Sequence, residues 1–389
     1  MMPVNILVVD DEPDVKYLIL QKFRKQIAAG QYEFSFAGHG EEALDKLKNN
    51  GQINLILTDI NMPVMDGLTL LSRINEINNP ILRSIIISAY GDLENIRAAM
   101  NRGAYDFVTK PIDMKDLEIT IEKSLKEIDQ YKLAIAARDK LIAIQQELDI
   151  ATVIQTSILP KIFPAFPDRK EFDIYAKMLP AKEVGGDLYD FFLIDKYRLG
   201  IVIGDVSGKG IASALLMAVS KTLLKATAFK GIAADSVLSE VNNILVDESP
   251  SNMFVTVFYG ILDTRSGALE YSNGGHNTPF LISSNGEVKP IDNVGGLILG
   301  AMKDAEYQSS VIVLKPDDSV FLYTDGITEA MNKNEEEFEE NRLLKCLTGK
   351  AKLSVQELLQ SVFDDVQSFT NGIEQSDDIT CLTLKYLKK

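Results

Sequence analysis

The strongest constraint on the fold is the way the first 110 residues alternate two patterns. Five short apolar runs rich in β-formers are separated by stretches of helical periodicity, such as residues 15–27. Because parallel neighbours in a sheet must be joined by a crossover, this alternation predicts a five-stranded parallel sheet with helices on both faces. The predicted strands are residues 6–9, 34–37, 55–58, 85–87 and 105–108.

Chemically complementary side chains follow the carboxyl ends of these predicted strands. Asp10 and Asp11 come after the first strand, Asp59 ends the third, Ser88 the fourth, and Lys110 follows the fifth. In such a sheet the ligand site lies beyond these ends, so the side chains would meet in one crevice. Two carboxylates roughly 4 Å apart repel by about 4 kcal/mol at an effective dielectric constant of about 20, so the acidic cluster requires a cation. Oxygen ligands favour Mg²⁺, and a carboxylate between Mg²⁺ and an ammonium can act as a nucleophile toward phosphorus.

Residues 1–123 resemble the receiver domain of two-component response regulators. The similarity rests on the motifs VVDDE, LTDINMPVMDG, IIISAYGD and GAYDFVTKP. It implies a flavodoxin-like domain in which Asp59 accepts a phosphoryl group from a sensor histidine kinase or a phosphotransfer protein. It also implies that Mg²⁺ is held by Asp10, Asp11 and Asp59, together with the backbone carbonyl of Asn61.

The same resemblance assigns roles to the remaining receiver residues. Lys110 and Ser88 stabilise charge on the transferring oxygens, and Tyr105 is the aromatic switch partner of Ser88. The Lys110–Pro111 bond would carry the family's cis peptide, which the sequence leaves open because most X-Pro bonds are trans. A lone acidic residue at a strand end is usually a turn residue or a helix cap, but five complementary groups at successive strand ends favour the receiver interpretation.

A long helical segment follows the predicted receiver. Residues 115–157 contain no Gly or Pro, which predicts one long helix or two stacked ones. Isoleucine recurs every seven residues, although the partner positions lack the Leu that a good two-stranded coiled coil uses. We predict that residues 124–158 form a weak parallel coiled coil that dimerises the chain; a single-chain helix packed on one domain is the alternative. The repeat consists of Ile121, Ile128, Ile135 and Ile142, with Ser124, Tyr131, Arg138 and Gln145 at the partner positions.

The second half of the chain has a different pattern. Its β-runs do not alternate regularly with helices, which predicts mainly antiparallel sheets with helices grouped outside them, an α/β sandwich over residues 159–389. The expected helices are residues 212–227, 236–245 and 354–369. The expected strands are residues 172–177, 199–203, 254–262, 269–272, 311–314, 320–323 and 379–386.

Acidic residues beside glycines stand out in this half. No His or Cys lies within their motifs, so zinc is disfavoured and two hard cations, Mg²⁺ or Mn²⁺, are expected. Two metals bridged by a carboxylate generate hydroxide and hold phosphoryl oxygens, which predicts a hydrolase. The residues are Asp187 in VGGDLYD, Asp205 in IGDVSGKG, Asp325 in YTDGITEA, and Asp377 with Asp378 in QSDDIT.

These motifs, in this order, resemble the PPM-type metal-dependent serine/threonine protein phosphatases, specifically the branch that contains the SpoIIE-like enzymes. The resemblance implies that Asp205 bridges both metals and that the carbonyl of Val206 is a further ligand. Of the last two acids, Asp377 is the expected metal ligand. Asp378, where many relatives have Asn, is the second candidate. The metal shells are completed by Asp187 and Asp325.

One feature departs from that family. Many eukaryotic members carry a His after the bridging Asp that is thought to act as general acid, but Val206, Ser207 and Gly208 follow here. The acid is therefore unassigned, and His276 in GGHNTP is either a weak candidate or a turn His hydrogen-bonded to backbone. Two lysines, Lys182 and Lys209, either contact the substrate phosphate or are solvated.

Composition limits the partners. Forty Lys and Arg against 56 Asp and Glu give a formal charge of −16, which disfavours nucleic acid as a ligand. No uninterrupted apolar run reaches the roughly 18 residues of a membrane helix, so a cytoplasmic protein without a membrane partner is expected. The two cysteines, Cys346 and Cys381, are too few for a disulfide framework or a structural zinc site.

Together the motifs predict a response regulator with an enzymatic output. In this hypothesis, phosphorylation of Asp59 controls a phosphatase that removes phosphate from Ser or Thr of a protein. The resemblance implies a phosphorylated anti-sigma-factor antagonist as the substrate. The alternative is a catalytically inactive, phosphorylation-dependent scaffold; a DNA-binding regulator would need a helix-turn-helix, which the sequence does not display.

Overall fold

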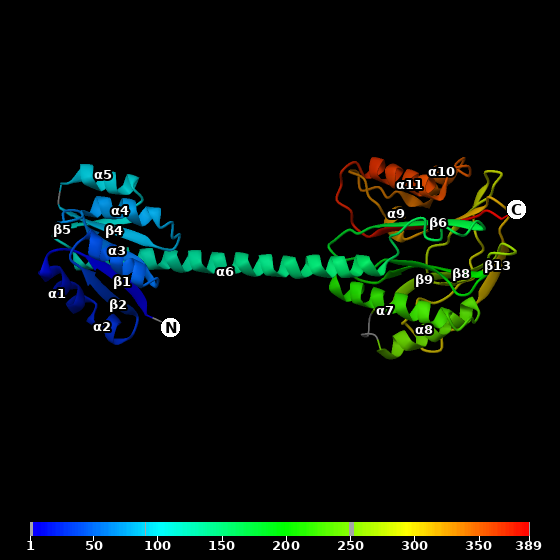
Figure 1. The fold of residues 1–389 in the computed structure, drawn as a ribbon, viewed down its shortest axis with the longest axis horizontal. Helices are drawn as coiled ribbons and strands as arrows, with labels where there is room; N and C mark the ends of the chain where they lie inside the picture. The colour runs from blue at the N-terminus through cyan, green and yellow to red at the C-terminus, as the bar shows by residue number, and fades with distance from the viewer. Residues whose placement is uncertain (1–2, 90, 249–252, 389) are drawn as a thin grey trace. The chain divides into compact units, whose positions relative to one another are not determined.

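The computed structural model describes residues 3–89, 91–248 and 253–388. The chain divides into two compact units, Met1–Ile144 and Gln145–Lys389. The division falls inside one helix, α6 (Met114–Ile158), which is 45 residues long (Figure 1). The segment predicted as one helix or two is therefore a single helix.

The first unit contains the predicted five-stranded parallel sheet, with strand order β2-β1-β3-β4-β5. Alternate residues of each strand face opposite sides, so Val8 packs with α1 and α6 on one face, whereas Val9 packs with α3 and α4 on the other. The strands are β1 (Val4–Val9), β2 (Tyr32–Ala37), β3 (Ile53–Asp59), β4 (Arg83–Ala89) and β5 (Asp106–Lys110). The helices before α6 are α1 (Pro13–Lys22), α2 (Arg24–Ala28), α3 (Gly40–Asn49), α4 (Gly67–Glu76) and α5 (Leu93–Asn101).

The helix predicted over residues 15–27 forms as two helices that meet at Phe23. This residue has φ −94° and ψ 15°, outside the α-helical region, and its side chain is fully buried. Its ring packs against Tyr32 at 5.9 Å and Phe34 at 5.4 Å between centroids. Tertiary packing of one aromatic residue therefore coincides with the break in the helical run.

The start of α6 belongs to the core of the first unit. Ile121 and Ile128, the first two members of the seven-residue repeat, are 0% and 2% exposed and pack with Leu117 and Leu125 against the sheet. By contrast, Ile142 is 49% exposed. The prediction of a coiled-coil seam that includes Ile121 and Ile128 is therefore wrong, because intramolecular packing already uses these side chains.

The second unit is a sandwich of two antiparallel sheets, as predicted. Their strand orders are β13-β10-β9-β8-β7 and β12-β11-β14-β15-β6. The strands of the first sheet are β7 (Leu188–Leu193), β8 (Arg198–Val206), β9 (Val255–Asp263), β10 (Ala268–Gly274) and β13 (Ser309–Val313). Those of the second are β6 (Phe172–Leu179), β11 (Phe280–Ile282), β12 (Val288–Pro290), β14 (Ser319–Tyr323) and β15 (Ile379–Tyr386).

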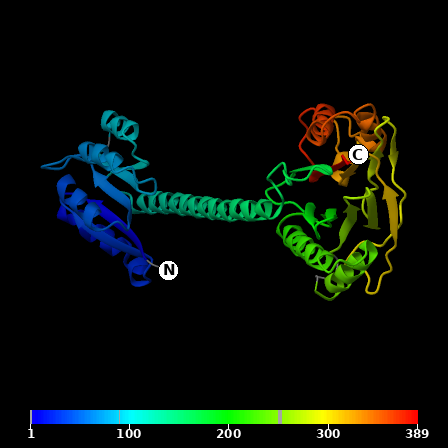
Figure 2. The ribbon, with the colours of Figure 1, turned by 45° about the vertical axis from the view of Figure 1, so that its right-hand side comes forward.

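Helices cover the outer faces of both sheets, with α7 and α8 on one side and α9 to α11 on the other (Figures 1 and 2). The inner faces interdigitate in a central core that includes Ile201 and Leu382. These helices are α7 (Ile211–Ala228), α8 (Ala234–Glu248), α9 (Asp325–Thr328), α10 (Glu339–Leu347) and α11 (Val355–Thr370).

Strand β7 was not expected from the sequence. Its residues are buried almost without alternation because both faces are covered: Tyr189 and Phe191 point into the central core, whereas Leu188 and Phe192 pack under α7. Period-two alternation, the usual strand signal, is therefore missing.

Four other elements were also not expected: strands β11 and β12 and helices α9 and α10. The first three of these have only three or four residues.

Helix α7 is the one helix among the described residues with the length and hydropathy of a membrane span, at a mean hydropathy of 1.3 over 18 residues. Its apolar run is interrupted by Lys221 and Lys225, and 44% of the window is buried within its own unit. The Lys221 ammonium lies 2.8 Å from the buried carboxylate of Asp190 in β7. These contacts are those of a core helix.

Candidate functional site

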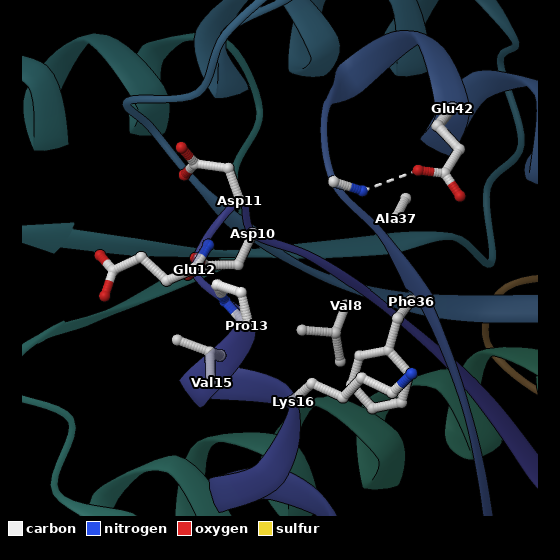
Figure 3. Close-up of a pocket in the computed structure, with 11 residues that line it drawn as sticks. Val8, Asp10, Asp11, Glu12, Pro13, Val15, Lys16, Phe36, Ala37 and Glu42 are labelled. Atoms are coloured by element: carbon white, nitrogen blue, oxygen red, sulfur yellow. Dashed lines mark hydrogen bonds between the residues drawn. The ribbon is translucent and has the colours of Figure 1, made fainter.

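The first candidate site lies at the carboxyl ends of β1 and β3. Carboxylate oxygens of Asp10, Asp11 and Asp59 all lie within 4.8 Å of one another. The parallel register places the ends of β1 and β3 side by side, since Val9 pairs with Thr58 immediately before Asp59. Figure 3 shows the side chains of Asp10 and Asp11 where the chain leaves β1. The structure thus brings together the acids that the sequence singled out.

Lys110 joins this cluster from the end of β5. Its ammonium lies 2.9 Å from Asp59, 2.9 Å from Glu12 and 3.4 Å from Asp10. Burial disfavours its charge, but hydrogen bonds to Glu12 and Asp59 and the charge of Asp10 outweigh burial and raise the pKa of Lys110 above its ordinary value. The Lys110–Pro111 peptide is cis.

The donor set fits a hard divalent cation. Asp10 Oδ2 is buried and accepts no hydrogen bond, and burial raises the pKa of Asp10 above its ordinary value. Asp59 is 5% exposed. Within the described part of the chain, the only hydrogen bond that its Oδ1 accepts comes from the N–H of the next residue, Ile60, at 2.8 Å. Clustered carboxylate oxygens with unused lone pairs are the donors that Mg²⁺ prefers. Asn61, the predicted carbonyl ligand, lies two residues beyond Asp59 in the loop before α4.

The predicted pairing of Ser88 with Tyr105 does not match the register. The N–H of Tyr105 donates to the carbonyl of Ser84, four residues before Ser88, which is roughly 13 Å along a strand. Burial and a hydrogen bond to Glu127 of α6 raise the pKa of Tyr105 to about 12. The ammonium of Lys123 in α6 lies 5.6 Å from the centroid of the Tyr105 ring. Phe107, two residues further along and 39% exposed, is the aromatic residue nearer to Ser88. The Ser88 hydroxyl is buried without a hydrogen-bond partner.

The second candidate site lies at one edge of the sandwich. Antiparallel strands alternate direction, so the start of β7 and the end of β8 lie at the same edge, as do the end of β14 and the start of β15. Asp187 precedes β7, Asp205 lies near the end of β8, Asp325 follows β14 and Asp377 precedes β15. Four motifs spread over nearly 200 residues are thus brought to one place by the topology.

The pKa values of these carboxylates are raised by burial and by one another's charges. Burial, then the charges of Asp325 and Asp377, raise the pKa of Asp205 to about 7. Burial and the charge of Asp205 raise the pKa of Asp187 well above its ordinary value, and burial and Asp377 raise that of Asp325. Among the described residues, only the receiver acids form a set of three with oxygens all within 4.8 Å, so the second cluster is the looser one. Its oxygen donors and mutual repulsion fit hard divalent cations.

Asp377 and Asp378 occupy different surroundings. Asp378 is 6% exposed, and its carboxylate accepts hydrogen bonds from the N–H groups of Ala181 at 2.8 Å and Gly186 at 2.6 Å. The partly exposed Asp377 pairs instead with the ammonium of Lys209 at 2.9 Å. Asp378 therefore holds backbone in place, whereas Asp377 is paired with a lysine and adds its charge to those of Asp205 and Asp325.

Close backbone approach explains two glycines of these motifs. A Cβ on Gly186 would lie 2.7 Å from the carbonyl oxygen of Val206, the predicted backbone ligand. A Cβ on Gly326 would lie 2.0 Å from the carbonyl oxygen of Asp378. Since real Cβ atoms do not approach this closely, only glycine allows the four segments to meet.

The remaining candidates are His276, for the general acid, and Lys182 and Lys209, for contacts with the substrate phosphate. His276 is buried, its Nδ1 lies 2.9 Å from the Thr256 hydroxyl, and burial lowers its pKa to about 4. A neutral buried imidazole of this kind is a poor proton donor at neutral pH, which leaves the general acid unassigned. Lys182 and Lys209 both line a small cavity beside Asp377 and Asp378.

Two residues of this site were missed by sequence reasoning. The hydroxyl of Thr324 donates to Asp187 at 2.8 Å, and Gln155 of α6 is hydrogen-bonded to Gly185. Thr324 stands directly before Asp325 and could have been noticed in the YTDG motif. Gln155 carries no local signal, because its partner is 30 residues away.

Two family models match this chain, one in each half. Residues 6–122 match the family described as Response regulator receiver domain, and residues 195–387 match Stage II sporulation protein E (SpoIIE). Sporulation initiation phosphotransferase F of Bacillus subtilis is 34% identical over 125 residues, covering 32% of this chain and 96% of that protein. Phosphoserine phosphatase RsbU of Bacillus subtilis is 29% identical over 259 residues, covering 66% of this chain and 76% of that protein.

A solved structure supports the fold of the second unit. The SiaA-PP2C domain of Pseudomonas aeruginosa has a TM-score of 0.56 and 21% identity, and the match covers 64% of this chain and 98% of that one. The chain spans between 44% and 76% of the length of the three curated relatives that match its longest stretches. The chain therefore belongs to the response regulators, with an N-terminal receiver domain and a C-terminal SpoIIE-type (PPM-type) protein serine/threonine phosphatase domain.

Proposed function

We propose that phosphorylation of Asp59 controls the hydrolysis of phosphoserine or phosphothreonine in a protein by the C-terminal domain. The observation that carries this proposal is the convergence of carboxylates from both sheets at one edge of the sandwich, in a chain that also has a receiver crevice. Carboxylates whose pKa values are raised by burial and mutual repulsion are typical of functional sites.

In the receiver, Asp59 would be the nucleophile toward phosphorus. Lys110 and the N–H of Ile60 hold its two oxygens, so that the carboxylate is oriented before the phosphoryl group arrives. Asp10, Asp11, Asp59 and the carbonyl of Asn61 would hold Mg²⁺, which neutralises the acids and the incoming oxygens. A sensor kinase or a phosphotransfer protein would be the donor.

In the phosphatase domain, Asp205 and the carbonyl of Val206 would hold two Mn²⁺ or Mg²⁺ ions, with the remaining ligands from Asp187, Asp325 and Asp377. When bound, such ions supply a hydroxide and hold phosphoryl oxygens. The chain's own contribution is orientation: Thr324 fixes the carboxylate of Asp187, and Asp378 fixes the adjoining backbone. Lys209 lies where it could contact a substrate phosphate.

The proposed substrate is a phosphorylated anti-sigma-factor antagonist. Similarity to RsbU, named as a phosphoserine phosphatase, supports phosphoserine as the substrate residue. The net charge of −16 argues against nucleic acid as a partner. We further propose a cytoplasmic location.

We also propose that α6 mediates a homodimer, with a seam shifted from the one expected. Leu141 and Ile144 are 68% and 44% exposed, and with Ala137 and Leu148 they follow the four-three-four spacing of a coiled coil. Unlike Ile121 and Ile128, these residues lie outside the buried cores.

The decisive experiment measures hydrolysis of p-nitrophenyl phosphate with Mn²⁺, with and without beryllofluoride as an acyl-phosphate mimic. We expect activity in the wild type, a change in rate with beryllofluoride, and loss of hydrolysis in Asp205→Asn. Metal binding without hydrolysis in either state would favour the scaffold alternative. Incubation with candidate phosphoproteins then tests the substrate class.

A further inference from the structure

A buried glutamine of α6 holds the loop that precedes a proposed metal ligand. Gln155 is 6% exposed, its Oε1 accepts from the N–H of Gly185 at 3.0 Å, and its Nε2 donates to the carbonyl of the same glycine. One turn earlier, the hydroxyl of Thr152 donates to the carbonyl of Glu183 at 2.5 Å. Both α6 side chains thus bind backbone groups of the loop at residues 183–186.

The opposite side of this loop is held by Asp378. Its Oδ2 accepts from the N–H of Gly186 at 2.6 Å, and a Cβ on Gly185 would lie 2.2 Å from the same oxygen. The loop is therefore fixed between α6 and the start of β15, with no room for a side chain at Gly185. Buried backbone groups need partners, and both polar groups of Gly185 depend on Gln155.

Asp187 follows two residues later. Its backbone N–H lies 3.4 Å from Asp378 Oδ2, and its carboxylate accepts from Thr324. The position of this carboxylate is therefore determined by the loop, and the loop is held by α6. A displacement of about 1 Å at a site of this kind is enough to lower a rate by about 100-fold.

We propose that Gln155 is a positioning residue that sets the place of Asp187 and makes the metal-dependent reaction sensitive to the last turns of α6. The inference rests on the proposed function and adds the contact through which regulation acts. The same helix carries Leu117 and Ile121, which are buried in the receiver core. A receiver change that moves α6 along or about its axis would therefore act on the amide of Gln155.

The test uses the full chain and compares Gln155→Leu with Gln146→Leu, a matched change at an exposed position of the same helix. Hydrolysis of p-nitrophenyl phosphate is measured against Mn²⁺ concentration, with and without beryllofluoride. For Gln155→Leu we expect kcat to fall by about tenfold or more, and the response to beryllofluoride to be lost. Gln146→Leu should match the wild type in both respects.

Two further readouts separate positioning from general damage to the fold. Mn²⁺ binding by calorimetry should weaken in Gln155→Leu, and amide hydrogen exchange should rise at residues 183–187 while the sandwich core keeps its protection. Thr152→Val, which removes the adjacent hydroxyl and leaves Gln155 in place, should shift both quantities in the same direction by less.

The outcomes distinguish this inference from the proposed function. An inactive or unresponsive wild type would refute the proposed function. An active and responsive wild type with a Gln155→Leu variant that behaves like Gln146→Leu would overturn the role of Gln155. Loss of exchange protection throughout the sandwich core in Gln155→Leu, with Thr152→Val unchanged, would also overturn it.

Discussion

Asp377 and Asp378 illustrate how surroundings separate two identical neighbours. The oxygens of Asp378 are occupied by backbone N–H groups of Ala181 and Gly186, whereas Asp377 adds negative charge beside Asp205 and Asp325. A carboxylate that accepts backbone bonds stabilises the fold, and one that repels its neighbours opposes folding until metal binds. Stability and activity should therefore respond differently to the same substitution at the two positions.

We expect Asp377→Asn to lower Mn²⁺-dependent hydrolysis by about 100-fold or more without lowering the stability of the metal-free protein. Asp378→Asn should instead lower stability by about 1 to 3 kcal/mol, because an amide nitrogen cannot accept from an N–H group. Urea unfolding without metal and hydrolysis assays with Mn²⁺ measure the two effects. Equal loss of stability in both variants would contradict this separation of roles.

His276 makes stability depend on pH in a defined window. Burial lowers the pKa of His276 from 6.5 to about 4, so between these values the unfolded chain binds a proton that the folded one does not. Stability is therefore lost as pH falls below about 6.5, and the loss from this group is complete below about 4, at about 3 kcal/mol. Its partners Thr256 and Asn273 do not titrate and cannot compensate.

A His276→Gln variant should lack this contribution. We expect the difference in unfolding free energy between wild type and variant to shrink as pH is lowered from 7 to 4, as measured by urea unfolding at a series of pH values. The raised pKa values of the metal-site carboxylates affect both proteins and cancel in the comparison. A difference that stays constant with pH would mean that His276 is not held neutral.

At the scale of elements, the side chains of α6 lie in three settings. Leu117 to Ile128 complete the receiver core, and Gln155 is buried in the phosphatase unit. Between them Leu141 and Ile144 remain exposed, although exposed side chains of this size are costly to leave in water. A second copy of the helix would bury them.

Leu141→Lys should weaken self-association about tenfold or more without unfolding either unit, because the side chain belongs to neither core. Ile119→Lys is the matched control, since Ile119 is 63% exposed on the same helix but lies outside the proposed seam. Sedimentation velocity over a range of concentrations measures the effect. Equal association of both variants would show that this stretch of α6 does not form the interface.

At the scale of the whole molecule, the chain combines two acidic centres suited to opposite reactions of a phosphoryl group. The receiver crevice is suited to gain a phosphoryl group, and the edge of the sandwich is suited to release one. Coupling between such sites typically corresponds to about 1 to 3 kcal/mol, or a change of about 5- to 150-fold.

Asp59→Asn should preserve basal hydrolysis of p-nitrophenyl phosphate and remove its response to acetyl phosphate or a cognate kinase. The amide cannot act as the nucleophile toward phosphorus, whereas the acids of the phosphatase domain are unchanged. The ratio of rates with and without acetyl phosphate measures the coupling. A response that survives in Asp59→Asn would mean that regulation does not pass through this residue.

Much of this organisation followed from the sequence because the signals are local. The fold class, the two domain families and the close approach of Asp10, Asp11 and Asp59 were predicted, since strand periodicity and motif order depend on residues close together in the chain. Strand β7 was missed because burial on both faces removes alternation.

Register and long-range contacts were decided only by the tertiary structure. Nothing near Tyr105 in the chain reveals that its N–H donates to the carbonyl of Ser84, and nothing near Gln155 reveals that it holds a glycine 30 residues away. Asp378 likewise takes its backbone partners from residues up to 197 positions distant. The sequence by itself determined which chemical groups are present and roughly where each strand ends. Which of these groups touch was decided by the packing of sheets and helices. Such contacts depend on how segments far apart in the chain fit together, and neither segment's own sequence indicates its partner.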